Sequence, residues 1–179
     1  MSVDPSVPLA ARVLGALVFV AAVYGKLRHR TEFIGVVANY RLLPQGLVRP
    51  AAWLVMGLEA LVVLSLAGDC GLVWGAALAT ALLAGFAVAM AINLVRGRKE
   101  IDCGCFRSTL RQPLSVALVA RNLVLGAVIL PLVVTVSRNM EFLQWLDGLA
   151  AGSVLFLLYQ SFDQLMAVRS VVATRGRLA

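Results

Sequence analysis

Residues 72–95 read LVWGAALATALLAGFAVAMAINLV, an apolar run without a charged side chain. As a helix rising ~1.5 Å per residue, a run of this length is long enough to cross a bilayer core of roughly 30 Å. Polar and apolar residues do not alternate along it, which argues against a strand of a membrane barrel. Because hydrocarbon cannot satisfy unpaired backbone groups, the stretch predicts a membrane-spanning α-helix.

The composition extends this reading to the whole chain. Of its 179 residues, 61% are hydrophobic, and the mean hydropathy is +0.91, which is typical of a membrane protein rather than a soluble one. We therefore predict an all-α polytopic membrane helix bundle with about five transmembrane helices around a four-helix core. No repeat or linker divides it, so a single integral membrane domain is expected over residues 1–179. Residues 1–8 lack a basic n-region, so the first span is expected to be retained. The five spans are residues 8–24, 51–67, 72–95, 114–136 and 142–168.

The first loop, residues 26–50, carries a second helical signal. Thr31 can cap a helix in which Phe33, Val36, Val37 and Tyr40 follow at helical spacing, and Pro44 ends the segment. We expect a short interfacial helix with its apolar face toward the membrane and nearby arginines reaching lipid headgroups. An ordinary ordered loop is the alternative.

Basic residues fix the expected orientation. Thirteen of the 16 Lys and Arg fall in the first loop, the third loop and the C-terminal tail, which share one side of the membrane if there are five spans. The positive-inside rule then places the N-terminus outside and the C-terminus inside. The net charge of +7 therefore reflects membrane topology, and no nucleic-acid partner is expected because basic and aromatic residues are not interleaved on one face.

Two pairs of glycines have the spacing that allows helices to approach closely. Gly71 and Gly75 lie near the outer end of the third span, and Gly148 and Gly152 lie near that of the fifth. We interpret both pairs as packing contacts without a functional role.

Charged residues inside the spans should face partners, because an ionised group in hydrocarbon costs about 2.5–3.5 kcal/mol on insertion scales. Glu59 and Arg121 fall at similar depths when counted from the ends of their spans, so we predict that they pair, with Asn93 and Asn122 as hydrogen-bonding neighbours. Such a pair could fix helix register or relay a proton. Asp163 is expected to pair with a base near the membrane surface.

The third loop contains two cysteines one residue apart, in the segment Lys99-Glu-Ile-Asp-Cys-Gly-Cys-Phe-Arg107. A disulfide between Cys103 and Cys105 would close a small strained ring, and strain makes a disulfide easier to reduce. Gly104 suits the tight backbone of such a ring. Neighbouring Lys and Arg favour the thiolate, whereas Asp102 opposes it. Thiol exchange, an inert reduced pair and a packing turn all remain open from spacing alone.

A metal site is a further alternative at this loop. His29 shares a face with Asp102, Cys103 and Cys105, which together would supply four ligands. Zinc sites usually separate their cysteines by two to four residues, however, and one intervening residue crowds the tetrahedron. We therefore expect neither a metal nor a cofactor.

A set of residues spread over nearly the whole chain resembles a known family. In order, they are Gly25-Lys26, residues 40–44, Glu59, Arg96-Gly97, Cys103-Gly104-Cys105-Phe106 and Arg121-Asn122. On these residues the chain is similar to MauE, the methylamine utilisation membrane proteins, which are related to DoxX-like redox-associated membrane proteins. Arg107 departs from that pattern, in which a glycine usually follows the phenylalanine, and this leaves the turn of the loop open.

The resemblance implies a role in maturation of the methylamine dehydrogenase small (β) subunit, a disulfide-rich periplasmic protein. It implies processing, export or disulfide formation beside a thioredoxin-like partner of the MauD type, in the bacterial inner membrane. Cys103 and Cys105 would be the reacting residues of a thiol–disulfide oxidoreductase accessory. The alternative is a non-catalytic assembly or export factor that docks the thioredoxin-like protein. Supporting positions would be Lys26, Glu59, Asp102, Gly104, Phe106, Arg121 and Asn122.

The orientation and the implied client conflict. The client is periplasmic, whereas the charge rule places Cys103 and Cys105 on the cytoplasmic side. A thiol relay through Cys70 on the outer face would reconcile them, as would an inverted topology. We favour the charge rule and interpret Cys70 as incidental. Oligomeric state does not follow from the sequence.

Overall fold

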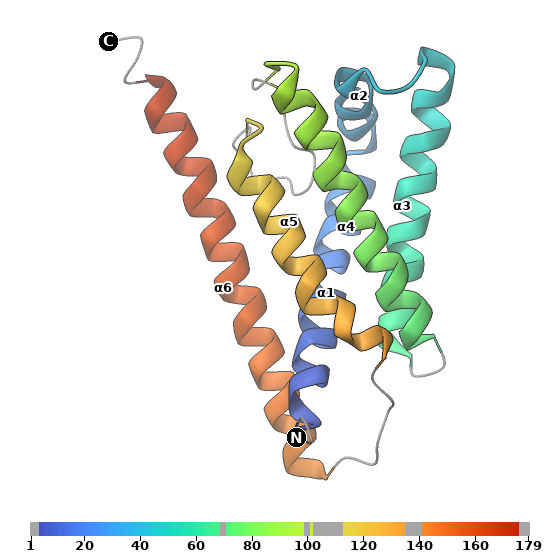
Figure 1. The fold of residues 1–179 in the computed structure, drawn as a ribbon, viewed down its shortest axis with the longest axis vertical. Coiled ribbons are helices and arrows are strands. Elements are labelled where there is room, and N and C mark those ends of the chain that lie inside the picture. Colours follow the sequence, from blue (N-terminus) through green and yellow to red (C-terminus); the bar gives the residue numbers. More distant parts are fainter. Residues whose placement is uncertain (1–3, 69–70, 99–100, 102–112, 135–140, 176–179) are drawn as a thin grey trace.

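The computed structural model describes residues 4–68, 71–98, 101, 113–134 and 141–175 (Figure 1). Five of the helices in these ranges are long and apolar enough to cross a membrane, as predicted, counting α5 with the short 3₁₀ turn η1 that continues it. The chain is therefore a multi-pass membrane protein. The elements are α1 (Ser6–Arg28), α2 (Arg30–Tyr40), α3 (Gln45–Ala67), α4 (Leu72–Val95), α5 (Val116–Ile129), η1 (Leu130–Val133) and α6 (Phe142–Arg175).

Four of these helices form the core of the bundle. Helix α1 packs on α3, α3 on α4, α4 on α5, and α5 closes the ring against α1. The centre is filled by fully buried apolar side chains from all four, such as Val62, Ala76 and Ile129. Helix α6 packs along α1 outside this ring and diverges from the other helices toward its C-terminal end (Figure 1). The predicted four-helix core is confirmed.

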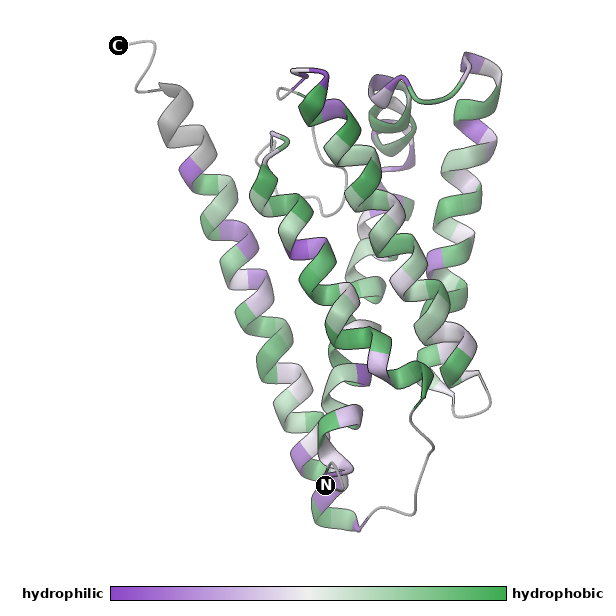
Figure 2. Cartoon of the chain, in the orientation of Figure 1, coloured by the Kyte–Doolittle hydropathy of each residue, from purple (hydrophilic) through white to green (hydrophobic). Residues whose placement is uncertain are grey.

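Several helices extend beyond the predicted spans. Helix α1 continues to Arg28, and α3 begins at Gln45, directly after Pro44 at its N-cap. The sequence boundaries were placed where hydropathy falls, but a helix can continue as an amphipathic turn beyond the hydrocarbon. Figure 2 shows hydrophilic residues gathered at the ends of α2, α3 and α4 on one side of the bundle.

Helix α2 confirms the predicted short helix in the first loop, with two corrections. Its N-cap is His29 rather than Thr31. Its apolar face does not turn to lipid, because Phe33 is buried in a cluster with Ala52 and Met56 of α3. The exposed side carries Arg30 and other polar residues. Helix α2 is thus fixed to the protein across the end of α3.

The glycine pair on α6 makes the predicted close contact. A Cβ added at Gly148 would lie 2.6 Å from Leu9 Cδ2, and one added at Gly152 would lie 2.6 Å from Val13 Cβ and 2.8 Å from the carbonyl oxygen of Ala10. The backbones of α1 and α6 therefore meet where a larger residue would keep them apart. Gly75 makes the equivalent approach to Ser65 between α4 and α3.

Replacing Gly152 with alanine is expected to destabilise the protein by about 1–3 kcal/mol, because the new methyl group meets backbone and must push α6 away. The measurement is reversible unfolding in mixed detergent micelles. Gly57→Ala on α3 is the matched control, since a Cβ there meets nothing within 4 Å. The control should be stabilised by about 0.4–1 kcal/mol. Equal changes in the two variants would contradict the close contact.

Arg12 joins α1 to the far end of α3. Its Nε donates to the carbonyl oxygen of Leu66 (2.5 Å), and its Nη2 donates to that of Ala67 (3.1 Å). The last carbonyl groups of a helix lack hydrogen-bond partners within the helix. A cation at this end is also stabilised by the partial negative charge of the helix dipole. Arg12 thereby caps the C-terminal end of α3 and fixes the position of α3 along α1.

Candidate functional site

The described residues on both sides of the cysteine loop are held in place. Helix α4 ends with Gly97 at φ 74, a left-handed conformation that glycine adopts readily, and the backbone N–H of Arg98 returns to the carbonyl of Asn93. On the other side, the N–H of Leu114 donates to the carbonyl oxygen of Ile101 (3.1 Å). The loop thus starts and ends at one place, between α4 and α5. Asp102, Cys103, Gly104, Cys105 and Phe106 lie outside the described residues.

Arg98 connects the start of this loop to α2. Its Nη1 donates to the Asn93 side-chain oxygen (3.2 Å) and lies 3.4 Å from the carbonyl oxygen of Tyr40. Tyr40 and Ile101 also pack against one apolar cluster that includes Met90 and Leu114. The end of α2 and the two sides of the cysteine loop therefore form one connected surface.

Below this surface lies a buried ion pair. Lys26 Nζ on α1 donates to Glu59 Oε1 on α3 at 2.5 Å, and the side chains are only 5% and 1% exposed. The Lys26 ammonium also lies 5.3 Å from the ring centroid of Phe33 and 5.2 Å from that of Phe86. Both distances suit a cation–π interaction. A carboxylate and two aromatic faces thus surround the ammonium. These contacts replace the hydration that the ammonium lost on burial.

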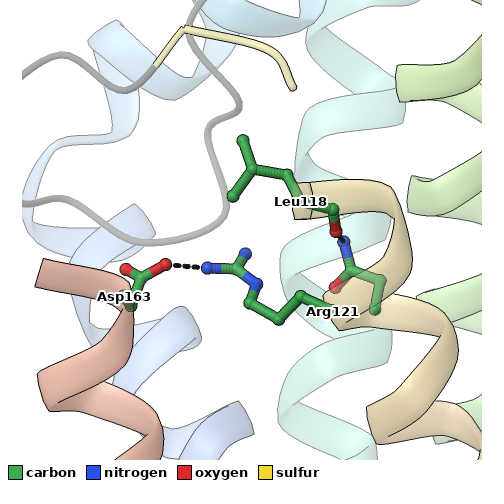
Figure 3. Close-up of polar contacts among 4 residues, drawn as sticks. Leu118, Arg121 and Asp163 are labelled. Atoms are coloured by element: carbon green, nitrogen blue, oxygen red, sulfur yellow. Dashed lines mark hydrogen bonds and ion pairs between the residues drawn. The ribbon is translucent and has the colours of Figure 1, made fainter. Parts of the chain in front are cut away.

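The predicted pairing of Glu59 with Arg121 is wrong. Glu59 pairs with Lys26, while Arg121 Nη1 on α5 forms an ion pair with Asp163 Oδ1 on α6 (Figure 3). The Arg121 guanidinium also lies 5.5 Å from the ring centroid of Tyr159. The depth comparison failed because α1 runs on to Arg28, which brings Lys26 into the bundle, whereas the hydropathy boundary had assigned it to a loop.

The two asparagines are both buried but have different surroundings. Asn93 Nδ2 donates to the carbonyl oxygen of Ala89, so both ends of this amide are bonded within the described residues. Asn122 Nδ2 donates to the carbonyl oxygen of Leu118 (3.2 Å). Of the two, Asn122 lies beside the Lys26–Glu59 pair, at a shared cavity. Asn93 instead belongs to the start of the cysteine loop.

One side chain links the ion pair to the loop. Phe86 on α4 faces the Lys26 ammonium and also packs against the cluster of Met90, Leu114 and Leu118 at the base of the loop. The predicted supporting residues of α1, α3 and α5 therefore lie toward the end of the bundle that carries the loop. They are Lys26, Glu59, Arg121 and Asn122. Asp163, Tyr159 and Phe86 belong to the same region but were missed as site residues; an acidic residue in a span was the available signal for Asp163.

Among the residues that the structure describes, no three His, Cys, Asp or Glu side chains gather in a way that could hold a metal ion. The arrangement of His29 with Asp102, Cys103 and Cys105 falls mainly outside the described ranges. What the described site offers chemically is two buried ion pairs and two asparagines beneath an anchored loop.

Comparison with known proteins gives one family. A family model described as "Methylamine utilisation protein MauE" matches residues 5–135. A "Methylamine utilization protein MauE" of Paracoccus denitrificans is 44% identical over 161 residues, covering 89% of this chain and 87% of the relative. The protein of that name from Paracoccus versutus is 40% identical over 164 residues, covering 90% and 88%. No solved structure matches the chain.

Proposed function

Because the chain belongs to the methylamine utilisation protein MauE family, we propose that it assists maturation of the methylamine dehydrogenase small subunit. The chemistry we propose is thiol–disulfide exchange at Cys103 and Cys105. The family ties the protein to methylamine utilisation, and the chain is a multi-pass membrane protein.

The observation that carries this proposal is the anchoring of the loop. Its two sides are joined by the Ile101–Leu114 backbone hydrogen bond, and Gly97 and Arg98 fix its start. The segment between them holds both cysteines and begins at a helix end, beyond the apolar part of α4. A short segment with fixed ends suits a thiol pair that has to meet another protein.

The exchange is balanced as follows. A client thiolate attacks the Cys103–Cys105 disulfide, a mixed disulfide forms, and one loop thiol leaves. The second client thiolate then attacks the mixed disulfide. The client gains a disulfide and loses two electrons, while Cys103 and Cys105 become two thiols. A thioredoxin-like partner carrying a disulfide accepts these two electrons and restores the loop.

The test is thiol trapping in cells that produce the client. Cys103→Ser and Cys105→Ser should each abolish client maturation, and one of them should accumulate a mixed disulfide that reductant removes. Cys70→Ser is the matched control and should mature the client normally. Full maturation in the Cys103→Ser/Cys105→Ser variant contradicts thiol exchange, and favours a docking role if the thioredoxin-like protein still co-purifies.

Location is the second part of the proposal. We place the protein in the bacterial inner membrane with its N-terminus outside, because the ends of α1, α3 and α4 on the loop side carry the exposed basic residues Arg28, Arg49 and Arg96. Labelling intact cells with a membrane-impermeant maleimide should then leave Cys103 and Cys105 unmodified until the membrane is opened. In the proposed orientation the thiols would meet the client before its export. Labelling in intact cells would reverse the orientation and place the thiols beside the exported client.

A further inference from the structure

A small cavity, partly open to the outside of the bundle, lies beside the Lys26–Glu59 pair, where five helices meet. Lys26 of α1, Glu59 of α3, Asn122 of α5 and Tyr159 of α6 supply its polar lining, and apolar residues of α1 and α4 complete it. Of the described residues that line it, all but Phe86 and Tyr159 are buried. The space is sufficient for about one water molecule.

Only one of the two carboxylate oxygens of Glu59 takes part in its ion pair. Oε1 accepts from Lys26, but Oε2 is buried and has no hydrogen-bond partner among the described residues. A buried charged oxygen without a partner is costly, so native proteins usually provide one, often as an internal water. Since Glu59 lines the cavity, the missing donor can be supplied from there.

The charges around the cavity indicate what kind of molecule would occupy it. Lys26 and Glu59 cancel each other. Helix α4 contributes only Leu83 and Phe86, whereas Arg121 of α5 is engaged by Asp163 of α6. An added ion of either sign would leave a net charge in a low-dielectric region. The occupant should therefore be neutral, very small and able to donate a hydrogen bond.

We propose that the cavity binds one water molecule, which donates to Glu59 Oε2 and makes the Lys26–Glu59 pair a proton-exchange site within the membrane. Asn122 and Tyr159 supply the further polar contacts that an internal water needs. Through this water, the Lys26 ammonium protons can exchange with solvent although the side chain is buried. The site does not depend on whether the cysteines react.

The test uses the full-length protein in lipid nanodiscs and solid-state NMR with magnetisation transferred from water. The Glu59 carboxyl carbon, assigned by its loss in Glu59→Gln, should receive water magnetisation. The control is the side chain of Asn93, which is 0% exposed with both ends of its amide bonded. The Asn93 side chain should receive little magnetisation from water. Transfer to Glu59 no greater than to Asn93 overturns the proposal.

Filling the cavity provides the second arm. Ala22→Leu adds three carbon atoms, and the gentler Val18→Leu adds one methylene, to side chains that both line the space. Either variant that folds should lower water transfer to Glu59 and should slow deuterium exchange of the Lys26 ammonium by about tenfold, as expected when exchange must await local opening. Unchanged transfer and exchange in a folded variant would show that the water lies elsewhere, which also overturns the proposal.

Discussion

Lys26→Met is expected to destabilise the protein by about 3–5 kcal/mol, because it leaves the Glu59 carboxylate buried without its counter-charge. Glu59→Leu should cost about as much for the opposite reason, since it leaves the ammonium of Lys26 between two aromatic rings. Both side chains are almost fully removed from solvent, so water cannot screen the charge that remains. The measurement is the free energy of unfolding in mixed micelles, at fixed detergent composition.

The double variant Lys26→Met/Glu59→Leu separates a pairing effect from a general loss of packing. Two apolar side chains of similar size bury no charge, so the double variant should recover most of the stability lost by either single one. Arg49→Met, on an exposed part of α3, is the control and should change stability by no more than about 0.5 kcal/mol. Losses that simply add in the double variant would contradict the ion pair.

Asp163→Asn is expected to have a similarly large effect, about 3–5 kcal/mol, but at a different place in the molecule. The substitution keeps the shape of the side chain and takes away the carboxylate that pairs with Arg121, which is buried. Helix α6 packs along α1, and near its C-terminal half it is tied to α5 by this ion pair and by Tyr159 beneath the guanidinium. The loss should therefore loosen that half of α6 first.

Electron–electron distances between spin labels on α5 and α6 would report this loosening. Val124 and Leu165 are exposed and can carry the labels. The distance distribution should broaden in Asp163→Asn and stay narrow in Asp147→Asn, which changes an exposed carboxylate on the same helix. An unchanged distribution in Asp163→Asn would mean that the ion pair does not hold α6 against α5.

The sequence predicted the spanning helices well, because a long apolar run in a membrane has one physical solution. It also identified the contact surface of α6, since Gly148 and Gly152 leave room that Leu9, Ala10 and Val13 of α1 fill. Both features depend on residues within one segment. They do not require knowing which segments become neighbours.

Which charged residues form ion pairs between helices was not predictable in the same way. Lys26 was assigned to a loop by hydropathy, so Glu59 was matched with the nearest base of similar depth, Arg121. The true partners depend on how far α1 continues and on where α6 packs, and both are decided by tertiary contacts. The reactive role of Cys103 and Cys105 stays a prediction, because those residues lie outside the described ranges.

Arg12 and Lys26 hold one pair of helices at two levels. Arg12 binds the final carbonyls of α3, and Lys26 binds Glu59 two turns earlier on that helix, from the opposite half of α1. Sliding α1 against α3 by a single residue, about 1.5 Å, would break both attachments together. These two helices therefore behave as a fixed frame, on which α2, α4, α5 and α6 pack.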